Sequence, residues 1–498
     1  MQKTETSKPK ERFNLVDEPW IPVSGSGLVS LREIFSNPDL ASFGGNARQK
    51  IALLKLLLAI AQAAATPESD DDWEEMGPEG MGDKCLAYLD KWHSKFFLYG
   101  PEPFLQMPVE KGALFSCGAL QPEIALGNNP RLFHMQCDQP LTDAEKALVL
   151  LTEINMALGG KRGDKNLSLA PELVKSSAAA SPGMGFQGFL HSFLIGESIL
   201  QTIWLNLASE DVISECPSAG DHLCPPPWEE MPRTETCEIA KRLAASFMGR
   251  LMPMSRFCLL DEDGVHFTEG ISHPSYKAGR WDPSVASINE KKGPRMLWAD
   301  PEKRPWRSLS ALLAGINSNR VDAFFCFNLK SGIQRLVNMD YGKFGIWSGG
   351  LKVSSNSGQQ YLTGSDDNVE SISWLESDYF SGEEWYPRLE NFMLWLENAA
   401  RILFGCVFQY YKKMGDEKSS HPAQACSVFW ELAESLWQPL IEACQESSKL
   451  PDLYLRYRTM AQEAYNQFCP NESSKQMTAW AEFYPKIKLP EKISKQGA

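Results

Sequence analysis

The pattern of apolar positions predicts one well-defined helix that carries a polar loop at each end. Apolar side chains recur at helical spacing between residues 142 and 158, as they do on one buried face of a helix. Thr142 and Glu145 have the spacing of a capping box, so the helix should begin there. Gly159 and Gly160 follow the last apolar position and should end it. The apolar face consists of Ala144, Ala147, Leu148, Leu151, Ile154 and Leu158.

The loops beside this helix are candidate ligand-binding segments. The entering loop contains Phe133, His134, Met135 and Gln136. The leaving loop, GGKRGDK, begins at Gly159 and places bare backbone amides beside Lys161, which favours an anionic ligand approached closely by backbone. A second interpretation is that Gly159 is only a helix cap and that a solvated basic loop follows it. The residues of this segment leave both interpretations open.

Earlier residues predict a mixture of strand and helix. Residues 13–23, FNLVDEPWIPV, are apolar with two prolines and predict a short strand at a sheet edge. Residues 47–65 predict a long buried helix. The stretch PESDDDWEEMGPEGMGD that follows is predicted to be an acidic surface loop, and residues 84–97 an amphipathic helix.

Beyond residue 380 the pattern is helical only. Apolar faces at helical spacing lie within residues 385–407, 425–440, 453–468 and 477–484, and the aromatic residues on these faces are interpreted as core. Four amphipathic helices with short connections predict a bundle. The sequence therefore predicts an α+β protein, with a large mixed α/β N-terminal domain at residues 1–380 and a C-terminal four-helix bundle at residues 381–498.

Composition narrows the function classes. The 498 residues include 49 lysines and arginines against 63 aspartates and glutamates, a net charge of -14. Any contact with nucleic acid must therefore be local or shared with partner subunits. The most apolar run, residues 51–65, is shorter than the roughly 20 residues of a membrane helix, and the first residues lack a signal-peptide pattern. We expect a cytoplasmic protein with no membrane partner.

No motif of an enzyme or a metal site is present in the sequence. The 12 cysteines form no CxxC pair, and the 7 histidines form no HExxH motif. The chain also lacks a Walker A loop, a GxSxG elbow and a GxGxxG loop after a strand. We predict no enzymatic activity, no catalytic residue, no cofactor and no metal.

The order of several short motifs resembles a known family. NLVDEPWIPV, a leucine-rich helix, PEPFLQ, a polar loop with a phenylalanine and a Gly-Gly loop follow one another as in CasA, the large subunit of the type I-E CRISPR surveillance complex Cascade. The resemblance covers nearly the whole chain. It implies a subunit that binds guide RNA and other Cascade subunits, recognises the PAM beside a double-stranded DNA target and helps to open the duplex for R-loop formation. It also implies recruitment of a separate helicase-nuclease in antiviral defence.

The resemblance assigns roles to the loops. The segment from Phe133 to Gln136 matches a family loop near the 5′ end of the guide RNA and the target DNA. Gly159 and Gly160, with Lys161 beside them, match a glycine loop that reaches the minor groove of the PAM. Lys277 in SHPSYKAGRWDPS is the local match to a lysine that enters the same groove. The other interpretation of this lysine is an exposed side chain whose stem packs on a tryptophan.

Residues 345–373 predict two alternating strands around a tip rich in serine, asparagine and glycine. In the family, a hairpin at this place carries a glutamine that wedges beneath the PAM and separates the first target base pairs. Asn356, Gln359 and Gln360 are the candidates, and the sequence does not choose among them. A different class of function also remains open: a structural scaffold that closes the end of a ribonucleoprotein assembly and reads no DNA.

Overall fold

The described residues fold into two compact units. The computed structural model describes residues 10–107, 113–121, 139–160, 188–216, 222–271, 273–291, 293–317, 323–356, 359–362 and 367–490. The first unit comprises Met1–Pro305, Ser318–Arg335 and Gly345–Ser371, and the second comprises Trp306–Asn317, Leu336–Phe344 and Ile372–Ala498. The domain boundary at residue 380 stays a prediction. The grouping by contacts starts the last segment of the second unit at Ile372 and adds two earlier segments to it.

Helix α2, Ala47–Ala65, is the central element of the first unit and lies where the sequence predicts it. Nearly all its side chains are buried, because α3, α4 and α5 pack around it. Asn46 and Gln49 form a capping box at its start. The other helices of this unit are α1 Leu31–Ser36, α3 Asp70–Lys91, α4 Asp143–Met156, α5 Ile199–Asn206, α6 Glu210–Ser214, α7 Glu238–Ala245 and α8 Met248–Leu251.

The prediction of an acidic surface loop after α2 is wrong, because most of these residues form the first half of α3. Ser69 accepts a hydrogen bond from the backbone N–H of Asp72, whose carboxylate accepts one from the N–H of Ser69. Acidic side chains in the first turn also complement the helix dipole. Gly77, with φ of +59°, bends the helix before Pro78. The run of charge is therefore a helix start.

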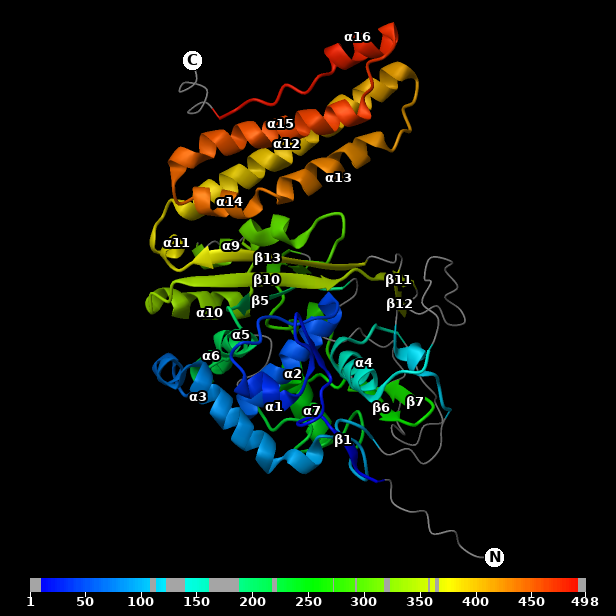
Figure 1. Ribbon diagram of the computed structural model, residues 1–498, viewed down its shortest axis with the longest axis vertical. Helices are drawn as coiled ribbons and strands as arrows, with labels where there is room; N and C mark the ends of the chain where they lie inside the picture. The colour runs from blue at the N-terminus through cyan, green and yellow to red at the C-terminus, as the bar shows by residue number, and fades with distance from the viewer. Residues whose placement is uncertain are drawn as a thin grey trace, which may run out of the picture. The chain divides into compact units, whose positions relative to one another are not determined.

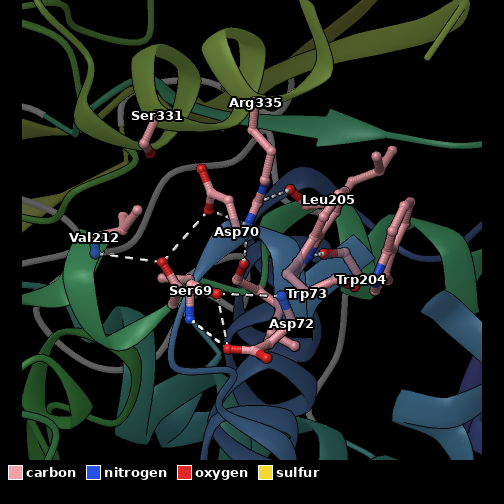
Figure 2. A network of polar contacts seen from close by, with 12 residues as sticks. Ser69, Asp70, Asp72, Trp73, Trp204, Leu205, Val212, Ser331 and Arg335 are labelled. Carbon is pink, nitrogen blue, oxygen red and sulfur yellow. Dashed lines mark hydrogen bonds and ion pairs between the residues drawn. The ribbon is translucent and has the colours of Figure 1, made fainter. Parts of the chain in front are cut away.

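A buried tryptophan pair holds α3 in place (Figure 2). Trp73 and Trp204 stack with ring centroids 3.7 Å apart, and each indole N–H donates to the other residue's carbonyl oxygen. The guanidinium of Arg335 lies 3.8 Å from the ring centroid of Trp73 and donates to the carbonyl oxygens of Leu205 and Leu207. Burial lowers the pKa of Arg335 to about 10, against the opposing effect of Asp70. The stacking of Trp73 and the Ser69 cap therefore stabilise a helix in a segment whose acidic side chains predict a loop.

The strands form small antiparallel sheets. The three-stranded sheet has the order β13-β10-β5, built from Asn368–Glu376, Lys343–Leu351 and His191–Ile195. The predicted strand at residues 13–23 is two strands, β1 and β2, which pair with different partners. The two-stranded pairs are β1 Arg12–Asn14 with β4 Phe97–Tyr99, β2 Ile21–Val23 with β3 Gly27–Val29, β6 Arg256–Leu260 with β7 Val265–Glu269, β8 Ser287–Glu290 with β9 Gly293–Met296, and β11 Ser354–Asn356 with β12 Gln359–Tyr361.

The second unit is helical at its C-terminal end, as the sequence predicts. Helices α12, α13 and α15 pack on one another (Figure 1), with Phe392 stacked on Tyr454 in the core. The predicted helix at residues 425–440 is broken into α13 and α14, because Pro439 has no N–H to donate and its ring would clash with the carbonyl of Ser435 in a continuous helix. The helices are α9 Leu309–Asn317, α11 Asp378–Ser381, α12 Trp385–Met414, α13 His421–Glu434, α14 Trp437–Ala443, α15 Leu450–Phe468 and α16 Ser474–Glu482; α10, Phe327–Asn338, runs from the first unit into the second.

Over the part of the chain that the structure describes, no single helix combines the length and apolarity of a membrane span. Helices α2 and α3 meet that test only as a pair, with a bend of 113° between them.

Candidate nucleic-acid interface

Helix α4 positions the Gly-Gly segment that the sequence singles out. Thr142 and Glu145 form the predicted capping box, in which the N–H of Thr142 donates to the Glu145 carboxylate over 2.8 Å. The helix ends at Met156, three residues before Gly159. Arg48 of α2 fixes this end, since its Nε donates to the carbonyl oxygen of Met156 over 2.9 Å and its guanidinium pairs with buried Glu153. Helix α4 is therefore anchored at both ends.

The glycine turn, residues 157–160, is bound from two sides. The Nη2 of Arg256, at the start of β6, donates to the carbonyl oxygens of Leu158, 2.6 Å away, and Gly160, 3.2 Å away. The N–H of Gly159 donates to Oε1 of Gln360 over 2.7 Å, and the N–H of Gln360 donates to the carbonyl oxygen of Gly159 over 2.9 Å. Both backbone groups of Gly159 are thus used inside the protein. Gly160 has φ of +116°, which favours glycine at this turn.

The hairpin β11–β12 brings Gln360 to the glycine turn. Ser355 lies opposite Gln360 in the register, and Asn356 lies opposite Gln359 next to the tip. The side chain of Gln360 is buried, with 1% of the residue exposed. Its backbone N–H is directed at Gly159, which lies about 200 positions away in the sequence, and not at β11. One of the three wedge candidates is therefore occupied within the fold.

Lys277 lies in a separate, exposed turn of the same unit. The 3-10 helix Tyr276–Ala278 carries it, and Ser275 Oγ accepts a hydrogen bond from its backbone N–H over 3.3 Å. The ring of Tyr276 packs edge-on against Phe189 and Trp298, with ring centroids 5.7 Å and 5.8 Å away. These aromatic contacts fix the turn while its lysine stays in solvent.

The same aromatic cluster lies against the strand that leads into the hairpin. A side chain at Gly350, near the end of β10, would collide with the carbonyl of Phe189. The next residues continue this anchoring, since the Nζ of Lys352 lies 3.2 Å from Asp300 and its backbone N–H donates to the carbonyl of Asp367. The Lys277 turn and the base of the hairpin thus share Phe189 as a common support.

A buried polar network holds the far end of the Lys277 loop. Asp282 lies 2.6 Å from Nζ of Lys55 in α2 and accepts hydrogen bonds from the N–H and hydroxyl of Ser284. Burial alone would raise the pKa of Asp282, but Lys55, His191 and the hydrogen bonds lower it to about 2. The imidazole of His191 lies 2.7 Å from Ser284 Oγ. Because the Ser284 hydroxyl donates to the carboxylate, the histidine does not act on it as a base, and the network is structural.

The structure places the predicted site residues unevenly. It brings Gly159, Gly160 and Gln360 together and leaves Lys277 exposed on its own turn. The other predicted residues lie outside the described part, either entirely or in their side chains: Phe133, His134, Met135, Gln136 and Lys161 entirely, and Asn356 and Gln359 in their side chains.

Sequence reasoning missed Arg256, whose only signal is an arginine that opens the apolar strand RFCLL. In the described ranges, no three His, Cys, Asp or Glu side chains are placed to hold a metal ion.

Comparisons with known proteins give a consistent result. The family model described as CRISPR-associated protein Cse1 matches residues 14–468. A CRISPR-associated protein CasA/Cse1 of Thermus thermophilus is 32% identical over 328 residues, which is 61% of this chain and 60% of the length of that relative.

Solved structures share the fold. A crystal structure of CasA from Thermus thermophilus has a TM-score of 0.69 at 22% identity, with 95% of this chain and 98% of that chain covered. A chain of a CRISPR RNA-guided surveillance complex has a TM-score of 0.68 at 15% identity, with 95% and 99% covered. These likenesses confirm the predicted α+β class with a helical C-terminal region.

Proposed function

This chain belongs to the CRISPR-associated Cse1 (CasA) family, and we propose that it is the large subunit of a type I-E Cascade surveillance complex. In this proposal it binds guide RNA and other Cascade subunits in the cytoplasm, recognises the PAM in double-stranded DNA and helps to open the duplex. It recruits a separate helicase-nuclease for antiviral defence and does not itself cut.

The observation that carries the proposal is the contact between Gly159 and Gln360. The segments proposed to read the PAM and to open the duplex lie far apart in the sequence, yet they are hydrogen-bonded in the fold. A protein that reads a flank and opens the adjacent base pairs needs these two segments within a few base pairs of each other. Such adjacency supports a joint role.

Each segment has a proposed part. The loop that begins at Gly159 and Gly160, with Lys161 next in the sequence, is proposed to reach the minor groove, where every base pair presents acceptors to a lysine such as Lys277. Asn356 and Gln359 are the residues proposed to insert beneath the PAM, since Gln360 is buried and bonded to Gly159. The segment from Phe133 to Gln136 is proposed to lie near the guide RNA. Inserting a side chain costs a few kcal/mol of unstacking, which the growing RNA–DNA hybrid offsets.

The net charge of the chain bears on whether it binds DNA by itself or only within the assembled complex. With a net charge of -14, the chain as a whole does not have the excess of positive charge that favours non-specific binding to DNA phosphates. We therefore expect its DNA contacts to operate within the assembled complex, where partner subunits hold the nucleic acid.

Lys277→Met tests the proposal, because it keeps the apolar stem and removes the charge. In an assembled complex this change should weaken binding of target duplex by about tenfold, the effect of losing one charged groove contact. Lys241→Met is the matched control, since Lys241 is an exposed lysine of the same unit that pairs with Glu238 on its own helix. Equal affinity of the Lys277→Met and Lys241→Met complexes would contradict a groove contact by Lys277.

The scaffold hypothesis keeps one observation in its favour, which is that both backbone groups of Gly159 are used inside the protein. It predicts that Lys277→Met and Lys161→Met leave DNA binding unchanged while assembly stays intact. The reader hypothesis predicts intact assembly with lost DNA affinity. Size-exclusion chromatography of each complex, followed by a duplex binding titration, separates the two.

A further inference from the structure

We propose that Gln360 is a positioning residue that clamps the hairpin β11–β12 to the glycine turn, so that flank recognition and duplex opening are mechanically coupled. This inference rests on the proposed function. It assigns Gln360 a role different from insertion into DNA, and it explains why the hairpin needs a glutamine at a buried position.

The clamp consists of two hydrogen bonds between one residue pair. The side-chain Oε1 of Gln360 accepts from the N–H of Gly159 over 2.7 Å, and the backbone N–H of Gln360 donates to the carbonyl of Gly159 over 2.9 Å. A single hydrogen bond leaves the partners free to rotate about it. Two bonds that run in opposite directions fix both the distance and the orientation of the hairpin relative to the turn.

Burial makes the clamp costly to open. Gly159, Gly160 and Gln360 are all buried, so a broken bond would leave a polar group without water, a cost of about 1–3 kcal/mol. Arg256, which is 4% exposed, holds the carbonyls on both sides of Gly159. The glycine turn is thus fixed to β6 by Arg256 and fixes β12 through Gln360.

The hairpin requires such support because it is short. Strands β11 and β12 have three residues each. A two-stranded hairpin of this size is marginally stable by itself in water. In our proposal the hairpin must keep its position while it separates the first base pairs, and the bonds of Gln360 to Gly159 hold it in that position. Without the clamp, the turn keeps its Arg256 contacts and the base of the hairpin keeps those of Lys352, but β12 loses the side-chain bond that fixes its orientation at the turn.

Loss of the clamp should therefore separate two activities that are joined in the wild type. Binding that depends on the flanking bases should persist, because the glycine turn remains held by Arg256. Opening of the first target base pairs should fall, because the wedge no longer has a rigid base. A merely structural residue would instead lower both together.

The test uses the full complex with its guide RNA and a set of duplexes with randomised bases beside the target. Binding is measured by titration, and opening by the fluorescence of 2-aminopurine at the first target positions. Gln360→Met keeps the length of the side chain and removes the acceptor. We expect flank-dependent affinity within about threefold of wild type and opening about tenfold slower, the effect of losing one buried hydrogen bond.

Three further variants keep the result interpretable. Gln360→Glu retains an acceptor oxygen and should restore opening. Gln62→Met is the matched control, because Gln62 is also buried and exchanges hydrogen bonds of 2.8 Å and 3.0 Å with the backbone of Ala208. It should lose similar stability without slowing opening. Gln360→Asn, whose acceptor is one carbon too short to reach, replaces Gln360→Met if that chain does not assemble.

The outcomes separate the clamp from the function on which it rests. Opening at the wild-type rate in Gln360→Met, or affinity and opening reduced by the same factor, overturns the clamp. A wild-type complex whose binding ignores the flanking bases overturns the proposed function itself, whatever Gln360 does.

Discussion

Titratable side chains in the interior of the first unit show how single residues affect its stability. Lys55, Asp282, Arg250 and His273 act on one another at buried positions. Burial raises the cost of each charge, and pairing offsets it only where a partner is in place, as for Lys55 and Asp282 at 2.6 Å. No carboxylate is among the causes of the pKa shift of His273. Its lowered pKa keeps the buried imidazole neutral, so no unpaired charge is buried there.

His273 should make the protein less stable as the solution is acidified. Burial, together with the charge of Arg250, lowers the pKa of His273 to about 3, against an unfolded value of about 6.5. The unfolded chain therefore takes up a proton below pH 6.5 that the folded chain does not. Stability present above pH 6.5 is lost as pH falls toward 3, by about 2 kcal/mol between pH 7.5 and 5. In His273→Asn this loss should disappear from the unfolding free energies measured at the two pH values.

An unchanged loss between pH 7.5 and 5 in the variant would show that other groups control the acid response. Asp282 contributes in a lower window, because its pKa of about 2 lies below its ordinary value, so its stabilisation is lost only as pH falls from about 4 toward 2. The two windows overlap little above pH 5.

At this scale the sequence could name candidates but not choose among them. Gln359 and Gln360 are adjacent and chemically identical, and a shift of one residue in register exchanges the faces of a strand. The contact of Gln360 with Gly159 depends on tertiary structure, which no local pattern contains. Arg256 was missed for the same reason.

Helices with a strong apolar periodicity have the bounds, or the capped start, that the sequence predicts. Helix α2 has the predicted bounds, and α4 begins at the predicted capping box. Helix α3 is predicted only in its second half, as part of residues 84–97, and in the structure it ends at Lys91. Its acidic first half has the composition of a solvated loop, although Ser69 and Asp72 have capping-box spacing. The break before α14 was missed because the apolar spacing continues through it, while Pro439 ends the backbone ladder.

Ser69→Ala tests whether the capping box holds the start of α3. Removing the hydroxyl leaves the N–H of Asp72 without its acceptor, which should lower the unfolding free energy of the first unit by about 1 kcal/mol. Chemical denaturation followed by Trp fluorescence is a suitable measurement, because Trp73 is buried in this helix. Exposed Ser474→Ala, inside α16, should have a much smaller effect. Equal effects of both changes would contradict a stabilising role of the Ser69 cap.

On the scale of the whole molecule, composition and periodicity were enough for the α+β class and the helical C-terminal region. They could not show that residues 306–317 and 336–344 join the second unit, because that grouping depends on packing between distant segments. The same holds for the candidate site. Its loops were visible as separate glycine-rich and polar segments, while their meeting at Gly159 and Gln360 required the fold.

The central claim is that this chain makes a guide-loaded complex sensitive to the bases beside its target. The direct measurement is duplex binding by the partner complex with and without this chain, across randomised flanking bases at one fixed salt concentration. Our account predicts that adding the chain creates binding that varies with those bases by about tenfold, because the amino group of guanine in the minor groove distinguishes G·C from A·T pairs. Binding that stays the same, or rises equally for every flank, would contradict it and leave the chain a scaffold.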